Sequence, residues 1–240
     1  MKRFTRFAPV VAACGLMALA NVAHATLITD ANSDFTIDWF LASGATDNDG
    51  DVNTNSFDLS ATADFDVIDF SYDAQTDKTS VTFDIAFTNT TVAPPGQVAG
   101  VTSFGFGVSP SLSTVVFQDS DSTGFINAIL QTGNQNFPGS FKNIDVCVFT
   151  QGCSGGGQPG AIAPNGGTDT FRLILTFGDE LSSIELDPFP IKIQTTTTSY
   201  EFAGCSGDCT TKVPEPGTAW LLGAGLVGLG LLRRRHAPAV

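Results

Sequence analysis

The chain has 240 residues, with 24 acidic and 11 basic side chains and a formal net charge of −13 at neutral pH. Such an excess of negative charge repels polyanions, which excludes nucleic acid and anionic lipid headgroups as partners of the main part of the chain. Both histidines, His24 and His236, lie near the ends of the sequence, so the long middle part cannot contain Ser-His-Asp or Cys-His catalytic systems or His-ligated zinc.

The first 25 residues are typical of a secretory signal peptide. Three basic residues within the first six precede the apolar stretch 7–20, and Ala23-His24-Ala25 follows as a cleavage site. We expect the secretion machinery to remove residues 1–25, so that the mature chain begins near Thr26. An alternative is a lipoprotein signal ending at Cys14, although the apolar stretch continues past that residue.

Residues 26–212 form the second part of the chain, and their length is that of a single domain with its own core. This segment contains five of the basic and 23 of the acidic residues, which gives it a formal charge of −18. Its surface should therefore favour cations over anions.

Alternating apolar and polar residues predict β-strands throughout this segment. The clearest are 35–41 and 80–88, with a hairpin turn at 73–78. The alternation changes phase near Val67-Ile68, which indicates a β-bulge. Further strands are expected at 101–108, 114–118, 125–130, 142–149, 170–177, 183–186, 191–197 and 199–202.

Many short strands separated by Gly, Pro, Asn and Asp predict an all-β fold, an antiparallel β-sandwich of the jelly-roll kind. The 20 phenylalanines of the chain fall largely on alternating strand positions. This placement favours a role in the core over a surface platform for ligands.

An acidic segment between two predicted strands is the candidate metal site. Asp47, Asp49, Asp51 and Asn53 place oxygen ligands on every second residue, as Ca²⁺ requires when the backbone curls around it. The spacing departs from an EF-hand loop, because the glycine is fourth instead of sixth. The alternative is an acidic, solvated turn chosen for its geometry, and this interpretation is favoured. No other cofactor is expected.

Four cysteines lie in the domain, and export to an oxidising compartment favours disulfides. We expect the local pairs Cys147–Cys153 and Cys205–Cys209, with crossed pairings as the alternative. A zinc site of four cysteines is disfavoured, because the intervals of five and three residues differ from the usual two.

Residues 213–240 form the third part of the chain. An apolar run at 219–232, expected to be a short transmembrane helix, covers only about 21 Å against a bilayer core of about 30 Å. Four glycines weaken the helix further, so the segment suits a temporary anchor. The residues that flank this run are Pro214, Glu215 and Pro216 before it and Arg233, Arg234 and Arg235 after it.

This order of Pro-Glu-Pro, short apolar run and arginine cluster resembles the PEP-CTERM sorting signal of bacterial exported proteins. The resemblance implies recognition by the membrane protease exosortase, temporary anchoring on the outer side of the cytoplasmic membrane, and release to the cell surface or extracellular matrix. It also implies an association with exopolysaccharide and biofilm. Residues 144–157 and 166–171, with their cysteine-glycine loop, resemble the cistern subgroup of these proteins.

Three functional hypotheses follow from the sequence. The first is an exported, non-enzymatic surface or matrix protein that accompanies exopolysaccharide. The second is a calcium-dependent carbohydrate-binding module, although Trp39 is the only tryptophan of the domain and leaves little for sugar stacking. The remote third is a carboxylate-based glycoside hydrolase, which needs two acids on one cleft. No catalytic residue is assigned, and the protein is not expected to be an enzyme.

Overall fold

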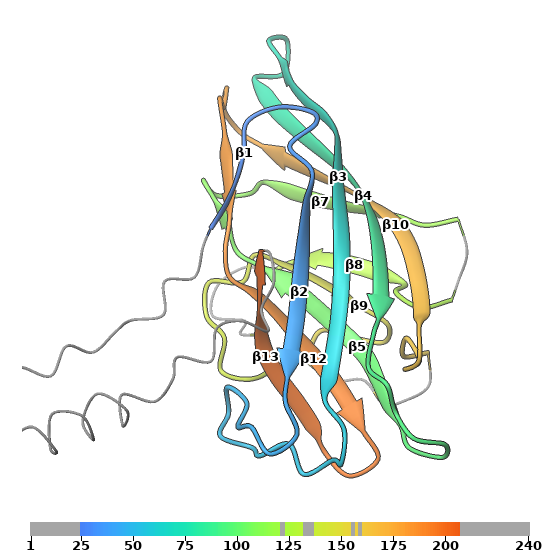
Figure 1. The fold of residues 1–240 in the computed structure, drawn as a ribbon. Helices are drawn as coiled ribbons and strands as arrows, with labels where there is room; N and C mark the ends of the chain where they lie inside the picture. Colours follow the sequence, from blue (N-terminus) through green and yellow to red (C-terminus); the bar gives the residue numbers. More distant parts are fainter. Residues whose placement is uncertain (1–24, 121–122, 132–136, 155–156, 158–159, 207–240) are drawn as a thin grey trace, which may run out of the picture.

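A computed structural model describes residues 25–120, 123–131, 137–154, 157 and 160–206 of the protein (Figure 1). Every regular element in these ranges is a β-strand, and every strand pair is antiparallel. None of the described residues forms a helix long and apolar enough to cross a membrane. The predicted signal peptide and sorting segment lie outside the described residues.

The described residues of the domain form thirteen strands. They are β1 (Thr26–Ile28), β2 (Phe35–Leu41), β3 (Leu59–Asp73), β4 (Lys78–Asn89), β5 (Ala99–Phe106), β6 (Val108–Ser109), β7 (Thr114–Gln118), β8 (Asn127–Leu130), β9 (Val146–Phe149), β10 (Gly167–Phe177), β11 (Ile184–Leu186), β12 (Phe189–Thr195) and β13 (Ser199–Ser206).

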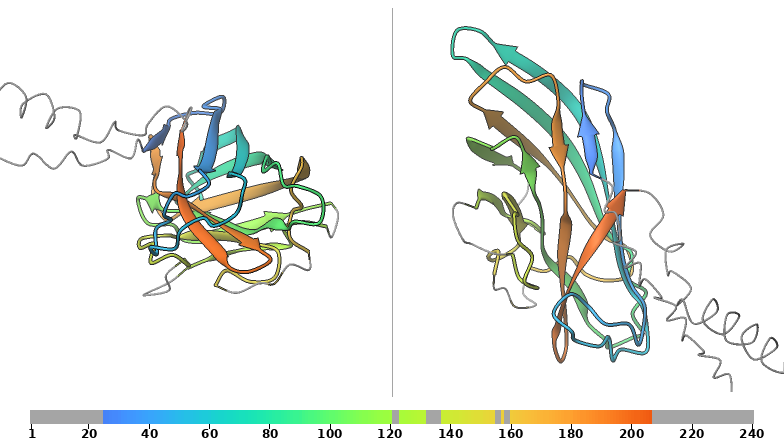
Figure 2. Two further views of the ribbon diagram at one scale, coloured as in Figure 1. Left: turned by 60° about the horizontal axis from the view of Figure 1, so that its bottom comes forward. Right: turned by 90° about the vertical axis from the view of Figure 1, so that its left-hand side faces the viewer.

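Ten of these strands form one sheet in the order β7-β10-β4-β3-β2-β13-β12-β5-β9-β8. Its two edge strands, β7 and β8, lie against each other, so the sheet curls back on itself into a nearly closed sandwich (Figure 2). The remaining strands form a small sheet in the order β1-β11-β6. The predicted all-β antiparallel sandwich is therefore confirmed.

Strands β3 and β4 form a long hairpin that contains the predicted bulge. Its register shifts between Val67 and Asp69, which leaves Ile68 as the extra residue. Strand β3 ends at Asp73 and β4 begins at Lys78, so the turn lies where the sequence predicts it. Residues on either side of the bulge therefore keep their apolar side chains toward the core, and the aspartates keep the outer face.

Several predicted strands begin later than expected, and those over 125–130 and 183–186 begin at Asn127 and Ile184. The strand predicted over 142–149 begins only at Val146. Asn143 has a φ of 60°, a left-handed conformation that cannot continue a strand. The strand predicted over 101–108 is divided into β5, which ends at Phe106, and β6, which begins at Val108, and the three-residue strand β1 was not predicted.

The core between the two layers is rich in aromatic rings, as the sequence predicts. Phe87 and Phe104 stack with ring centroids 5.5 Å apart, and the edge of Phe125 meets both rings at 5.0 and 5.3 Å. Such offset and edge-to-face contacts add to the free energy of burial. The buried Trp39 indole donates a hydrogen bond of 2.8 Å from Nε1 to the carbonyl oxygen of Phe189, which joins β2 to β12.

A second apolar cluster lies on the other face of β9. Val146 and Val148 of this strand belong to the main core, so the residue between them points away from it. The cluster consists of Phe137, Phe141, Ile144, Cys147 and Cys153.

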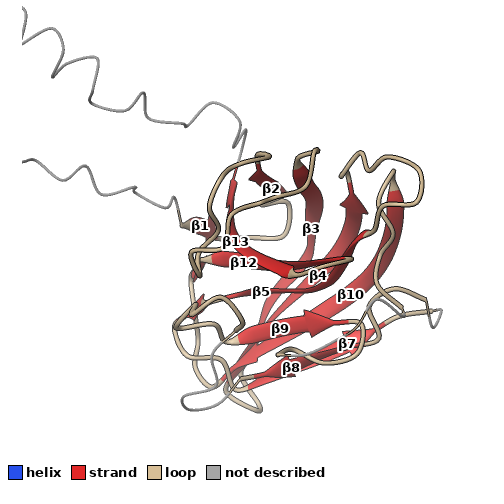
Figure 3. Ribbon diagram, turned by 90° about the horizontal axis from the view of Figure 1, so that it is seen from below, coloured by secondary structure: helices blue, strands red, loops and turns tan. Residues whose placement is uncertain are grey.

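The two ends of the described domain share one side. In Figures 1 and 3, β1 and the end of β13 lie on that side, whereas β10 lies on the opposite side. The pairing order agrees, because β2, β3 and β4 separate β13 from β10 in the sheet.

Candidate functional site

A groove with polar walls lies on the outer face of the large sheet. It has a volume of about 640 Å³, within the range of ligand-binding sites in proteins. Strands β3, β4, β10 and the end of β7 provide its walls. The lining residues are Asp64, Asp66, Asp84, Ile85, Ala86, Gln118, Asp119, Ser120, Thr170, Phe171 and Arg172.

Strand alternation and register bring the charged groups of the groove together. Successive residues of a strand point to opposite faces, so the residues next to buried Phe65, Phe83 and Phe171 face outward. The register then places Asp84 of β4 opposite both Asp66 of β3 and Arg172 of β10. These three groups are up to 106 positions apart in the sequence. They lie side by side because the sheet order is β3-β4-β10.

Arg172 and Asp84 form a two-point ion pair in this groove. Arg172 Nε donates to Asp84 Oδ1 at 2.7 Å, and its Nη2 donates to Oδ2 at 2.8 Å. These hydrogen bonds lower the pKa of Asp84 and raise that of Arg172, although desolvation acts against both shifts. Both side chains are about two-fifths exposed, with values of 41% and 44%, so the pair adds little to stability. Its effect is to fix the orientation of the two planar groups.

The pKa of Asp66 is shifted in the opposite direction to that of Asp84. Partial desolvation raises its pKa, and the hydrogen bond with Asp34 and the negative charges of Asp34 and Asp84 raise it further. Neighbouring carboxyls of the groove therefore differ: Asp84 is held as a carboxylate, whereas Asp66 retains its proton to a higher pH. Asp64, the next outward residue along β3, accepts a hydrogen bond of 2.6 Å from the Thr36 hydroxyl.

The groove thus offers both kinds of hydrogen-bonding group. Carboxylates accept, the guanidinium of Arg172 donates, and the amide of Gln118 and the hydroxyl of Thr170 do both. Its formal charge is negative, since four aspartates face one arginine. Among the described residues, no three His, Cys, Asp or Glu side chains are grouped so that they could hold a metal ion.

The sequence did not single out this groove. Two signals were available: Arg172 is the only arginine between the predicted signal segments, and Asp64, Asp66 and Asp84 lie on the polar positions of predicted strands. The alternation of apolar and polar residues shows which side chains of a strand point outward. It does not give the strand order that makes these residues neighbours.

The acidic segment predicted as a calcium site forms a tight turn. Thr46 and Val52 form an isolated antiparallel bridge, and the segment between them closes over Asp47. One carboxylate oxygen of Asp47 accepts the backbone amides of Asp49 and Asp51, at 3.0 and 2.9 Å. Its other oxygen accepts the backbone amide of Glu201 at 3.1 Å. Asp47 therefore ties the turn to β13.

Asn53, the fourth predicted ligand, also has a structural role. Its amide nitrogen lies 3.3 Å from three carbonyl oxygens, those of Leu41, Ala42 and Phe57. Its side-chain oxygen accepts two hydrogen bonds from Asn55. Asp49 and Asp51 are exposed on the turn. These contacts account for the segment as a solvated acidic turn, and calcium binding there stays a prediction.

Beneath the same turn lies a buried ion pair. Lys192 Nζ of β12 is 3.5 Å from Glu201 Oε1 of β13, and the two side chains are 11% and 6% exposed. Burial raises the pKa of Glu201, the positive charge of Lys192 lowers it, and the Asp47 carboxylate raises it. The turn thus covers a charged contact between the two strands.

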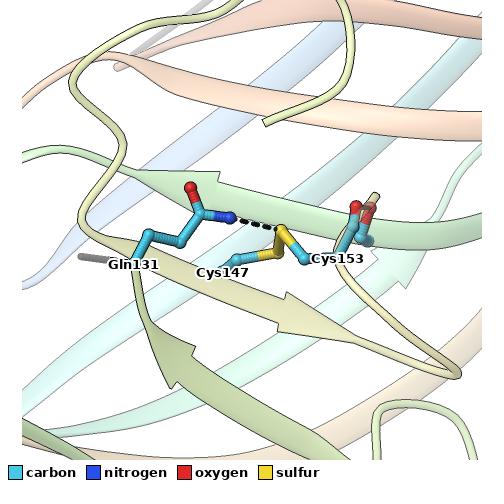
Figure 4. Close-up of a disulfide and its surroundings, with 4 residues drawn as sticks. Gln131, Cys147 and Cys153 are labelled. Atoms are coloured by element: carbon cyan, nitrogen blue, oxygen red, sulfur yellow. Dashed lines mark hydrogen bonds between the residues drawn. A yellow bond between two sulfur atoms is a disulfide. The ribbon is translucent and has the colours of Figure 1, made fainter. Parts of the chain in front are cut away.

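The predicted Cys147–Cys153 disulfide is confirmed (Figure 4). It links β9 to the loop that follows, within the second apolar cluster, and the buried side-chain amide of Gln131 donates to Cys153 Sγ at 2.7 Å. Cys205 is also disulfide-bonded. Its predicted partner, Cys209, lies outside the described residues.

The residues of the predicted sorting signal, Pro214, Glu215, Pro216 and Arg233, Arg234 and Arg235, also lie outside the described residues. Comparison of the sequence with protein families nevertheless covers this segment. A family model described as the PEP-CTERM protein-sorting motif matches residues 212–235. No curated protein and no solved structure matches the chain. The match covers all six of those residues, and the chain accordingly contains a PEP-CTERM protein-sorting motif, which implies export to the cell envelope or surface.

Proposed function

We propose that this protein is a non-enzymatic component of the cell surface or extracellular matrix that associates with exopolysaccharide. The single observation that carries the proposal is the sorting motif at 212–235 on a chain whose remaining domain has no histidine. In this proposal the secretion machinery removes residues 1–25, and exosortase cleaves the chain near Pro214-Glu215-Pro216. The acidic β-domain is then released from its temporary anchor at 219–232.

Two properties of the domain support its location outside the cytoplasm. The Cys147–Cys153 disulfide suits an oxidising compartment. The formal charge of −18 over 26–212 keeps the released domain soluble and disfavours polyanionic partners.

The proposal is tested by mass spectrometry of the protein from membrane, surface and released fractions. We expect peptides of 26–206 in the surface or released fraction and peptides of 219–232 only in the membrane fraction. Replacing Pro214 and Pro216 with alanine should trap the chain in the membrane. The matched control, Pro94→Ala with Pro95→Ala, changes two exposed loop prolines and should leave sorting unchanged. Released protein that still contains 219–232 would contradict the processing.

The groove itself supports a second candidate function, carboxylate-based hydrolysis of a glycan. Asp66 and Asp84 are cross-strand neighbours whose pKa values shift in opposite directions, as in the acid and nucleophile pair of a retaining glycosidase. The test is the release of reducing ends from polysaccharide by the exported protein and by its Asp66→Asn variant. Release that disappears in the variant favours the hydrolase, and no release by either protein rejects it.

A further inference from the structure

The charge of the groove restricts the ligands that it can hold. Its walls carry four aspartates and one arginine, and Asp84 already neutralises that arginine. A uronate, sulfate or phosphate group placed here would meet a net negative charge at short range. Polyanionic polysaccharides are therefore the wrong chemistry for this surface, as they are for the domain as a whole.

The hydrogen-bonding groups of the groove favour hydroxyl groups. Carboxylate acceptors on β3 and β4 lie beside the guanidinium donor of β10 and the amide of β7. A ligand that both donates and accepts at each position satisfies this arrangement, and a sugar hydroxyl does both. An apolar ligand would leave these polar groups unpaired, which costs free energy.

The groove is also organised before any ligand arrives. The two hydrogen bonds between Arg172 and Asp84 fix both side chains, and the Thr36 hydroxyl holds Asp64. All four groups lie on inner strands of the large sheet. Less conformational entropy is therefore lost on binding.

We propose that the groove between β3, β4, β10 and the end of β7 binds a neutral, hydroxyl-rich segment of polysaccharide without calcium. This inference rests on the proposed function and specifies its site and ligand class. Asp64 and Asp84 accept hydrogen bonds from sugar hydroxyls, while Gln118 and the outer edge of the Arg172 guanidinium donate to sugar oxygens. The aromatic ring that lines the groove, Phe171, is only 5% exposed, so stacking adds little and each site binds weakly. Many copies on one polymer supply the overall strength.

Affinity electrophoresis of the exported protein in gels with dissolved polysaccharide tests this proposal. The probes are dextran, mannan, alginate and the neutral polysaccharide extracted from the producing culture. We expect retardation by at least one neutral probe, none by alginate, and no change on adding EDTA. A probe bound through hydroxyls should also remain bound when salt is raised, because the contact does not depend on net charge.

Matched variants assign the binding to the groove. Asp84→Asn combined with Arg172→Gln removes both charges with little change in shape, and Gln118→Ala and Thr170→Ala remove exposed groups that the fold does not need. Each should weaken retention, the double variant at least tenfold. Asp49→Asn removes one charge from the exposed turn and should change retention less than twofold. Thermal melting of every variant confirms that it is folded.

The outcomes separate this inference from the proposed function. Retention that is equal in wild type and groove variants overturns the groove and leaves matrix association standing. Alginate binding as tight as that of the neutral probes overturns the ligand class, and loss of binding with EDTA overturns calcium independence. No retention by any probe, the extracted polysaccharide included, overturns both this inference and the association with exopolysaccharide.

Discussion

The buried ion pair between Lys192 and Glu201 supports a quantitative prediction. In a Lys192→Met variant, the apolar stem is replaced by one of similar length, while Glu201 loses the cationic partner with which it forms an ion pair. The remaining carboxylate is 6% exposed and faces Asp47, another carboxylate. Removing one member of a buried pair costs about 3–5 kcal/mol of unfolding free energy, because an uncompensated charge stays behind.

The loss should depend on pH, and the direction follows from the pKa of Glu201. Burial raises this pKa above its ordinary value of 4.5, and Lys192 partly opposes the shift. Without Lys192, the pKa in the folded state rises further. A carboxyl with a raised folded pKa gives stability that is present below the unfolded pKa and is lost as pH rises through the folded pKa. The loss of unfolding free energy in the variant, relative to wild type, should therefore be smaller at about pH 5 than at about pH 7.

Urea unfolding of both proteins at the two pH values measures this difference. The lower pH, about 5, stays above the sequence pI of about 4.2. At its pI the protein would have no net charge and would precipitate. A second substitution, Glu201→Gln in the Lys192→Met background, removes the unpaired charge and should recover most of the stability. A deficit below about 1 kcal/mol, or one equal at both pH values, would refute the reasoning.

Three further changes probe the fold, each measured by urea unfolding. Replacing Cys147 and Cys153 with serine opens a loop with a sequence separation of 6 and should cost about 2 kcal/mol from loop entropy; an unchanged midpoint under oxidising conditions would contradict this. Trp39→Phe removes the buried 2.8 Å hydrogen bond to β12 and should cost about 1–3 kcal/mol; a loss no greater than that of an exposed substitution would argue against the bond. Gly107→Ala places a Cβ against two backbone carbonyl oxygens and should cost about 2 kcal/mol or more, whereas Gly178→Ala meets only a serine hydroxyl at 3.6 Å and should be nearly neutral; equal effects would show that the backbone can yield.

Local patterns in the sequence predict the strands well. The run 35–41 matches β2 at both ends, and the phase change near Val67 marks the bulge of β3. Alternation succeeds here because one face of each strand is buried, which ties the side-chain period to the fold. It fails where a special backbone conformation intervenes, as at Asn143, since a left-handed residue leaves no mark on the hydrophobic pattern.

The groove shows the limit of such reasoning. Asp66, Asp84 and Arg172 each sit on a predicted strand, yet their meeting depends on β10 pairing with β4 rather than with a sequence neighbour. Long-range pairing is set by the packing of the whole core. The acidic turn is the converse case, because its composition suggested ligands, while the Asp47 carboxylate instead accepts backbone amides that the turn exposes.

The position of the domain ends has a consequence for display. The end of β13 lies on the side of β1, opposite β10, whose outer face forms a wall of the groove (Figures 1 and 3). Ser206 pairs with Ile37 of β2, so a tether that continues from it toward the sorting motif is attached next to the β3 side of the groove and away from its β10 side. We therefore expect a polymer to approach the groove from the β10 side, which β2, β3 and β4 separate from the attachment point, while the chain is held at the membrane.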